Sequence, residues 1–344
     1  MRVTIKEIAV MAGVHPSTVD KVLHNRIGVS DDVRKHVREI IQQVGYTPNL
    51  VGRALQKQRI TFHIAAVLVD VDAKAYLQKG IERQINQWAG FDIKITYYGT
   101  SFMNIAEQAQ IIEKLIEERV DGIILSPINS QPVREAVDHA VNAGIPVITT
   151  NSDLENSRRT CYIGQDGVRA ARVAGRLMGE FMGGCGKIAV VTSSSAKEHN
   201  SYYVRIREQE FTAFLQIEYP RIEVVERLEN MEDPRITYTK TKQFLEKQQD
   251  LNGVYITCGG VPEVGRALRE VGREKQIKVL CFEDYPEILQ MMREGIVTCT
   301  LASELEKQGE LPLRVLMEYL VYGTLPQEKT IFTDIKILVK ENLM

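Results

Sequence analysis

The side chains of this sequence that are best suited to chemistry lie where apolar, strand-like stretches end. They offer carboxylate, amide, hydroxyl and guanidinium groups, at Asp72, Tyr76, Asn151, Asp153, Arg205, Arg207, Glu283 and Ser303. Open parallel sheets bind ligands beyond the carboxyl ends of their strands. The pattern therefore predicts a site for a small polar ligand that is bound largely through hydrogen bonds.

The motifs of common catalytic and metal-binding sites do not occur in the sequence. The six histidines are dispersed, and neither GxSxG nor HExxH is present. The run Gly183–Lys187 resembles a phosphate-binding loop, but Phe181 replaces its first glycine and Ile188 its Ser or Thr. The five cysteines show no CxxC spacing, which indicates free thiols in a reducing compartment. We therefore expect no enzyme, no metal ion and no cofactor.

Strands and helices alternate along the chain after residue 60. The strands are expected at Ile64–Val69, Ile93–Tyr98, Gly122–Ser126, Pro146–Thr150, Lys187–Thr192, Ile222–Arg227, Gly253–Thr257, Lys278–Phe282 and Val297–Leu301. Helical stretches between them include Asn104–Arg119, Gln131–Asn142, Val168–Met182, Pro234–Gln248 and Val261–Val271. Apolar runs such as IAAVLV and GIILSP are typical of parallel strands that are covered on both faces. The predicted fold class of this part is α/β, with two doubly wound parallel sheets.

Charge is distributed unevenly along the 344 residues. The first sixty residues carry ten Lys/Arg and five Asp/Glu, a net charge of +5, whereas the whole chain has a net charge of −2, which leaves −7 on the rest. A basic segment on an acidic body favours a nucleic-acid contact confined to that segment. No apolar run reaches the roughly 20 residues of a membrane helix, and the N-terminus is too polar for a signal peptide. We expect a cytoplasmic protein without membrane contact.

The first sixty residues read as three short helices, a small all-α headpiece. Thr4-x-x-Glu7 is a capping box at the start of the first helix. Gly13 breaks the helical pattern, and a second helix starts at His15-Pro16. A third helix opens after Ser30. Three helices with a glycine turn between the first two predict a helix-turn-helix, whose second helix enters the major groove of DNA.

Residues 3–55 resemble the headpiece of the lactose-repressor (LacI/GalR) family, through the pieces TIKEIAVMAGV, STVDKVL, VSDDVRKHVREIIQQVGYTPN and RAL. The resemblance implies a headpiece at 1–48 and a hinge helix at 49–60, whose Leu55 wedges into the minor groove. The DNA-contacting residues are expected to be Thr4, His15, Pro16, Ser17, Thr18, Lys21, His24, Asn25, Arg34, Asn49, Arg53 and Leu55. Asp20 departs from the family pattern, and we favour a positional or base-reading role for Ser17 and Lys21 over Asp20.

The same resemblance implies a two-lobed sensor of the periplasmic-binding-protein type at 61–344. The first lobe would comprise about 61–163 and 304–325, and the second about 164–303 and 326–344, with crossings near Gly164, Ser303 and Leu325. Asn151, Arg207 and Glu283 stand at positions that the family uses to bind sugar hydroxyls. The family's frequent Asn-Asp near Cys258 is replaced by CGGVP, which weakens the case for a simple pentose or hexose.

The combined interpretation is a sequence-specific transcriptional regulator of the repressor type, controlled by a small polar ligand such as a sugar or sugar derivative. Its partners would be pseudo-palindromic double-stranded operator DNA, the effector and a second copy of the chain in a homodimer. Two alternatives remain open: a sugar-binding receptor for transport, which shares the fold of the body, and an α/β enzyme that uses the cleft between the lobes.

Overall fold

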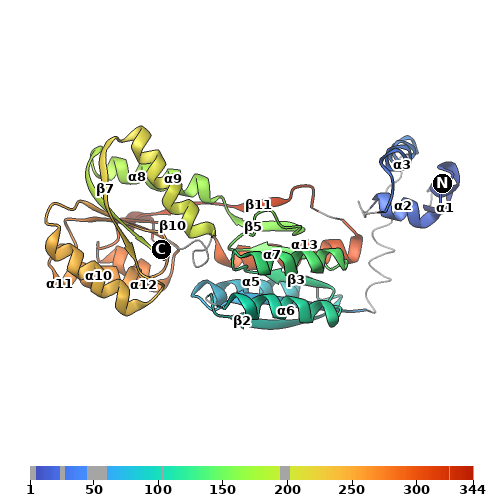
Figure 1. The fold of residues 1–344 in the computed structure, drawn as a ribbon, viewed down its shortest axis with the longest axis horizontal. Coiled ribbons are helices and arrows are strands. Elements are labelled where there is room, and N and C mark those ends of the chain that lie inside the picture. The colour runs from blue at the N-terminus through green and yellow to red at the C-terminus, as the bar shows by residue number, and fades with distance from the viewer. Residues whose placement is uncertain are drawn as a thin grey trace.

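The computed structural model describes residues 5–23, 28–44, 60–102, 104–193, 202–324 and 326–343. Three N-terminal helices are followed by two α/β lobes, each built around its own six-stranded sheet (Figure 1). The helical headpiece, the two doubly wound sheets and the predicted α/β class of the body are confirmed. None of the described helices is long and apolar enough to cross a membrane.

The headpiece consists of α1 (Ile5–Met11), α2 (Pro16–Leu23) and α3 (Asp31–Gln43). Gly13 adopts φ 63° between α1 and α2, a left-handed conformation that glycine accepts without steric cost. The three helices share a small apolar core, formed by Ile8, Ala9, Ala12, Val19, Val22, Val37 and Ile40. This arrangement confirms the helix-turn-helix expected from the sequence.

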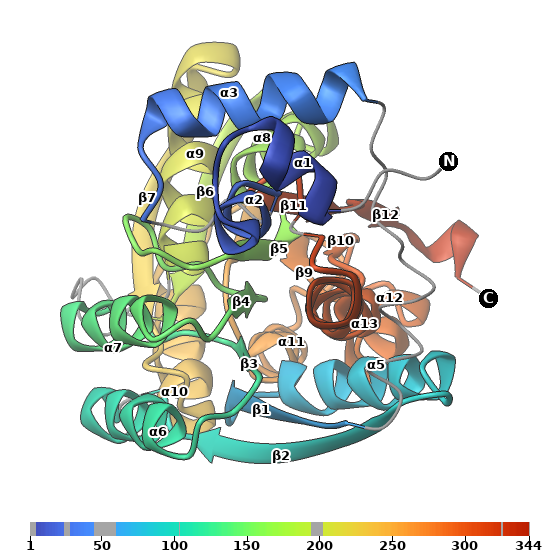
Figure 2. The same cartoon turned by 90° about the vertical axis from the view of Figure 1, so that its right-hand side faces the viewer.

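The sheet of the first lobe has the strand order β11-β5-β4-β3-β1-β2, and its strands are parallel. The strands are β1 (Thr61–Val69), β2 (Asp92–Thr100), β3 (Gly122–Leu125), β4 (Val147–Thr150), β5 (Cys161–Gln165) and β11 (Thr330–Thr333). Helices α5 (Ala73–Gln87) and α13 (Leu305–Met317) cover one face (Figure 2). Helices α6 (Ile105–Glu117) and α7 (Gln131–Asn142) cover the other. A π-helical turn, Glu318–Tyr322, follows α13.

The sheet of the second lobe has the order β12-β10-β9-β8-β6-β7, in which only the pairing of β12 with β10 is antiparallel among the described strands. The strands are β6 (Cys185–Thr192), β7 (Arg221–Glu229), β8 (Gly253–Ile256), β9 (Lys278–Phe282), β10 (Cys299–Ala302) and β12 (Lys336–Leu338). One face is covered by α8 (Gly167–Phe181) and α9 (Tyr202–Glu218). The other is covered by α10 (Pro234–Lys247), α11 (Val261–Glu270) and α12 (Pro286–Arg293). A 3-10 turn, Lys340–Asn342, ends the described chain.

The chain passes between the lobes after β5, after β10 and after β11. The first two passages lie close to the expected crossings near Gly164 and Ser303. The third differs from the expected crossing near Leu325, a residue outside the described ranges. Because β11 pairs with β5, residues 330–333 belong to the first sheet, whereas the sequence interpretation assigned them to the second lobe. Only β12 and the residues after it return to the second sheet.

Candidate ligand cleft and DNA-contacting helix

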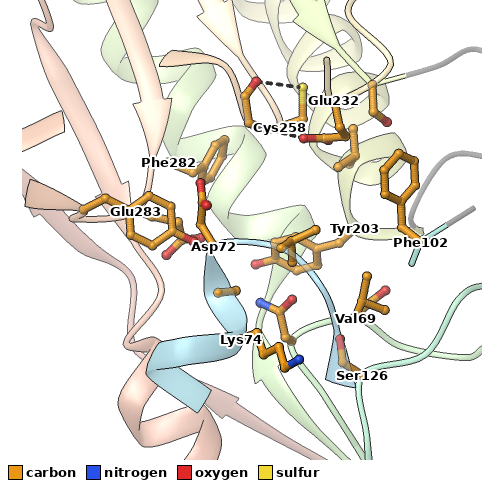
Figure 3. A pocket seen from close by; sticks show the side chains of 18 of the residues that line it. Val69, Asp72, Lys74, Phe102, Ser126, Tyr203, Glu232, Cys258, Phe282 and Glu283 are labelled. Carbon is orange, nitrogen blue, oxygen red and sulfur yellow. Dashed lines mark hydrogen bonds between the residues drawn. The ribbon is translucent and has the colours of Figure 1, made fainter. Parts of the chain in front are cut away.

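A cavity of about 1010 Å³ separates the two lobes at the carboxyl ends of their strands. The ends of β1, β3 and β4 contribute one wall, and the ends of β8 and β9 together with the start of α9 contribute the other. The first lobe presents Asp72, Lys74 and Phe102, and the second presents Tyr203, Glu232, Cys258, Phe282 and Glu283 (Figure 3). The site therefore combines aromatic faces with several charged groups.

A buried ion pair lies in the wall of the second lobe. Arg207 is 6% exposed and donates from Nη2 to Glu283 Oε1 at 3.1 Å and from Nη1 to the carbonyl of Thr257 at 3.2 Å. Its guanidinium carbon lies 3.4 Å from the ring centroid of Phe282 and 4.3 Å from that of Tyr203. The Nε of Arg207 is buried without an acceptor among the described residues. The guanidinium is thus held on both sides, and its Nε has no acceptor among the described residues.

Glu283 is fixed by both its backbone and its side chain. Its φ of 71° is left-handed, as is the φ of 65° at Asn151, and both residues line the cleft at a strand end. Ser303 donates to Glu283 Oε2 from its backbone nitrogen at 3.2 Å and from its hydroxyl at 2.7 Å. Non-glycine residues in this region cost about 1–3 kcal/mol and cluster at functional sites. Two residues with strained backbones thus border the cleft.

The structure places five of the eight residues expected at the ligand site in the lining of the cleft, and three outside it. Five of them line the cleft: Asp72, Tyr76, Asn151, Arg207 and Glu283. Tyr76 of the first lobe lies 5.3 Å, ring centroid to ring centroid, from Tyr285 of the second, so an aromatic contact spans the two lobes. The other three, Asp153, Arg205 and Ser303, are absent from the cleft lining.

Each of these three residues has a different environment. Asp153 is buried and accepts hydrogen bonds from Arg159, at 2.5 Å from Nε and 2.6 Å from Nη2, and from the hydroxyl of Thr149 at 3.0 Å. Arg205 lies over the ring of Tyr202, 5.7 Å from its centroid. Ser303 acts through Glu283, as described above. Arg207 lines the cleft and Arg205 does not, because both lie on α9 and residues two apart on a helix point in different directions.

The sequence interpretation missed several lining residues, of which Glu232 and Cys258 are the most informative. The backbone N–H of Gly259 donates to Glu232 Oε2 at 3.2 Å. Burial raises the pKa of the Glu232 carboxyl and raises that of the Cys258 thiol well above its ordinary value. The signal that could have located Glu232 is CGGVP, because a Cβ at Gly259 would lie 2.6 Å from the Glu232 carboxylate. Glycine there leaves room for the acid.

The helix expected to read DNA, α2, presents a polar outer face. Ser17 is exposed, Thr18 and Lys21 are half-buried, and Pro16 is the first residue of the helix. His15 Nδ1 accepts from the backbone N–H of Ser17 at 3.2 Å and lies 2.8 Å from its hydroxyl, so the imidazole caps the helix. Arg34 on α3 is half-buried. The remaining residues expected to contact DNA, Thr4, His24, Asn25, Asn49, Arg53 and Leu55, lie outside the described ranges.

The charged groups of the cleft are carboxylates and bases rather than a set of metal ligands. Within the described residues no three His, Cys, Asp or Glu side chains are placed to hold a metal ion. The geometry offers hydrogen-bond donors, acceptors and aromatic faces around a space that is large enough for a small organic molecule.

Two protein families match the sequence in separate ranges. Residues 65–324 match the family described as Periplasmic binding protein domain, and residues 4–49 match Bacterial regulatory proteins, lacI family. The first range is more than half of the chain and contains the cleft. The second contains α1, α2 and α3.

Curated relatives include transcriptional regulators and a transport receptor. The HTH-type transcriptional regulator DegA of Bacillus subtilis is 30% identical over 156 residues, 44% of this chain and 45% of that protein. MalR of Streptococcus pneumoniae serotype 4, also an HTH-type transcriptional regulator, is 35% identical over 128 residues, 36% and 38% of the two chains. The chain thus matches less than half the length of these two regulators. The ribose import binding protein RbsB of Bacillus subtilis is 23% identical over 270 residues, 76% and 81% of the two chains.

Solved structures share the fold of the two lobes. An ABC transporter solute binding protein from Burkholderia graminis C4D1M, in complex with D-arabinose, is similar at a TM-score of 0.76 and 27% identity, over 82% of this chain and 96% of that one. GanP, a glucose-galactose binding protein from Geobacillus stearothermophilus, is similar at a TM-score of 0.74 and 23% identity, over 83% and 99%. The second likeness concerns the fold alone.

Proposed function

We propose that this chain, which belongs to the periplasmic binding protein domain family over residues 65–324 and to the lacI family of bacterial regulatory proteins over residues 4–49, is a ligand-controlled DNA-binding transcriptional regulator. The observation that carries the proposal is the presence in one chain of a polar, exposed face on α2 and a ligand-sized cleft around the Arg207–Glu283 pair. The relatives DegA and MalR, which are transcriptional regulators, support it.

On the DNA side, α2 inserts into the major groove of an operator. Ser17 and Lys21 read base edges, and the basic residues of the headpiece contact phosphates. One headpiece touches too few bases for useful specificity, so the regulator acts as a homodimer on a pseudo-palindrome. In the hinge, Leu55 wedges into the minor groove, and Asn49 and Arg53 contact the DNA beside it; all three residues lie outside the described ranges.

On the ligand side, the effector is a small polar molecule of the sugar type. Asp72, Asn151, Arg207 and Glu283 supply hydrogen bonds, and Tyr76 joins the aromatic faces around them. The D-arabinose complex of the solute binding protein from Burkholderia graminis supports a ligand of this kind. A ligand that binds one arrangement of the lobes better than the other shifts operator affinity, and about 1–3 kcal/mol of coupling changes that affinity about 5- to 150-fold.

The repressor role and the cytoplasmic location follow from the same function. A regulator that occupies an operator blocks transcription unless it also recruits the polymerase, and it must share a compartment with the chromosome. A transport receptor is the second candidate, which the likeness to RbsB favours. The polar face of α2 distinguishes the two, because a receptor for sugar import has no use for a helix-turn-helix.

The experiment that tests the function is selection of DNA by the full-length chain from a randomised pool. We expect an enriched pseudo-palindrome, bound specifically in fluorescence anisotropy. Ser17→Ala should weaken that site while leaving binding to unrelated DNA nearly unchanged, since Ser17 is exposed on α2. Asn86→Ala on the exposed surface of α5 is the control and should bind like the parent. Failure to enrich any sequence would contradict the proposal.

A further inference from the structure

We propose, building on the function above, that the effector carries a positively charged amino group, which is bound between Asp72 of the first lobe and Glu232 of the second. The chemical class is a small polyhydroxylated amine, of which amino sugars are the simplest members. The argument rests on the charges of the cleft, on how Glu232 is built into it, and on two buried polar atoms without partners.

The cleft lining has an excess of negative charge. Among the described residues it contains the five acids Asp70, Asp72, Glu232, Glu283 and Glu287 and the two bases Lys74 and Arg207. Both bases are already occupied, Lys74 by Asp70 and Arg207 by Glu283. In the part of the chain that the structure describes, Asp72, Glu232 and Glu287 have no cation within ion-pair distance. Such a lining repels phosphorylated and carboxylated ligands and attracts a cation.

Glu232 is held in the cleft by a specific turn after β7. Met231 and Glu232 adopt φ values of 54° and 53°, two consecutive left-handed residues. Asn230 braces the turn: its Oδ1 accepts from the Glu232 backbone N–H at 3.0 Å, and its Nδ2 donates to the carbonyl of Gly259 at 2.9 Å. The carboxylate itself accepts from the Gly259 N–H, a neutral donor. Strain of this kind persists where the surrounding structure enforces it and is typical of binding sites.

Asp72 and Glu232 line the cleft from opposite lobes. Burial raises the pKa of Glu232 most, and the negative charge of Asp72 on the other lobe raises it further. Their repulsion resists approach of the lobes when the cleft is empty. An ammonium group between them replaces that repulsion with two charge-assisted hydrogen bonds. A cationic ligand thereby favours the closed arrangement, which is the differential affinity that a switch requires.

Two other buried atoms in the lining point to the remainder of the ligand. Arg207 Nε and Ser152 Oγ are buried without hydrogen-bond partners among the described residues, and both residues are 6% exposed. Buried polar atoms in native proteins nearly always have partners, so these two await groups that a ligand supplies. Hydroxyl groups suit both, because a hydroxyl accepts from the guanidinium and either donates to or accepts from a serine. Hydroxyls together with an amine define the proposed class.

The test measures binding of named probes to the full-length chain by thermal shift and titration calorimetry, below the pKa of the sugar amine. The amines are D-glucosamine, D-galactosamine and D-mannosamine. Each is paired with its N-acetyl derivative, its neutral parent sugar and its 6-phosphate. We expect at least one amine to bind more tightly than all three of its matched derivatives. No binding by any of the amines, or tighter binding of a neutral or phosphorylated partner, would overturn the proposal.

Variants locate the amine within the cleft. Glu232→Gln and Asp72→Asn should each weaken the amine about 10- to 100-fold, the effect of one charge-assisted hydrogen bond. Gly259→Ala keeps every charge but displaces the Glu232 carboxylate, and it should weaken the amine in the same direction. Asp284→Asn is the matched control, because Asp284 is exposed next to Glu283 and outside the lining. If Glu232→Gln bound the amine with unchanged affinity, the proposal would be contradicted.

Failure of this inference is distinguishable from failure of the proposed function. Binding to the selected DNA is measured on the same preparations. Specific DNA binding without amine binding rejects only the proposal that the effector is an amine. Amine binding without specific DNA binding rejects the regulator and leaves the assignment of the cleft intact.

Discussion

Arg207 and Glu283 form the most constrained ion pair of the cleft. Their side chains are 7% and 11% exposed, and two donors of Ser303 complete the coordination of the carboxylate. Burying a pair of charges is costly, and the cost is offset only when hydrogen bonds satisfy the remaining atoms. Removing one partner therefore leaves an uncompensated buried charge, which is more harmful than the loss of a surface ion pair.

Glu283→Gln tests this point. We expect the free energy of unfolding to fall by about 3–5 kcal/mol, because the Arg207 charge stays buried without its counter-charge. Urea denaturation followed by circular dichroism measures the change. Asp250→Asn is the matched control, since Asp250 pairs with Lys187 at 2.6 Å on the surface and should change stability little. Equal effects of the two variants would refute the special cost of the buried pair.

At the scale of residues, the sequence predicts positions at strand ends but not their detailed surroundings. Asn151, Arg207 and Glu283 were predicted from polar residues after apolar strands and from the family resemblance, and all three line the cleft. Asp153 also follows β4, but two residues beyond Asn151 it turns away to Arg159. Glu232 was missed because its position depends on a left-handed turn and on space at Gly259, neither of which follows from periodicity.

Among the elements, α5 and α13 pack with unusual closeness in the first lobe. A Cβ at Gly80 would lie 1.9 Å from the carbonyl oxygen of Glu306, and one at Gly309 would lie 2.1 Å from that of Leu77. The two glycines bring the helix backbones together, and ion pairs from Lys79 and Arg83 to acids of α13 flank the contact. The backbones of the two helices are so close at these glycines that an added methyl group has no room.

Gly80→Ala should therefore destabilise the protein although alanine favours helices. We expect a loss of about 1–3 kcal/mol, the usual cost of overpacking, because the obstacle is backbone rather than a flexible side chain. Thermal unfolding measures it. Asn86→Ala on the exposed surface of the same helix is the control, and helix propensity makes it neutral or slightly stabilising. A stabilised Gly80→Ala variant would show that the helices separate readily.

The sequence predicts most of the buried strands but not all of the strands. Strands such as β1 and β6 were recognised because apolar runs mark strands covered on both faces. Three strands were missed: β11 and β12 lie at sheet edges and carry exposed Phe332 and Ile337, whereas β5 is a buried inner strand of five residues. Without β11, the third crossing was placed too early in the chain.

For the whole molecule, the uneven charge distribution has a measurable consequence. Because the first sixty residues carry a net charge of +5, we expect DNA affinity to fall steeply with salt, with a slope near −0.9 for each phosphate neutralised. Lys35→Ala should reduce the slope by about one and weaken all DNA sequences equally, since Lys35 is exposed on α3. Anisotropy titrations at several salt concentrations measure both. Affinity that is independent of salt would contradict the expected phosphate contacts.

Because the chain returns to the first lobe, the core of that lobe is completed only after most of the second lobe has been synthesised. One core of that lobe joins residues between Phe62 and Ile163 to residues between Leu311 and Val321, whereas the cores of the second lobe draw on residues between Ala170 and Leu301. A ribosome adding about 5–20 residues per second needs about 7–30 s to cover the interval from Ile163 to Leu311. For that time the apolar face of the first lobe lacks α13, while the buried residues of the second lobe's cores are all made.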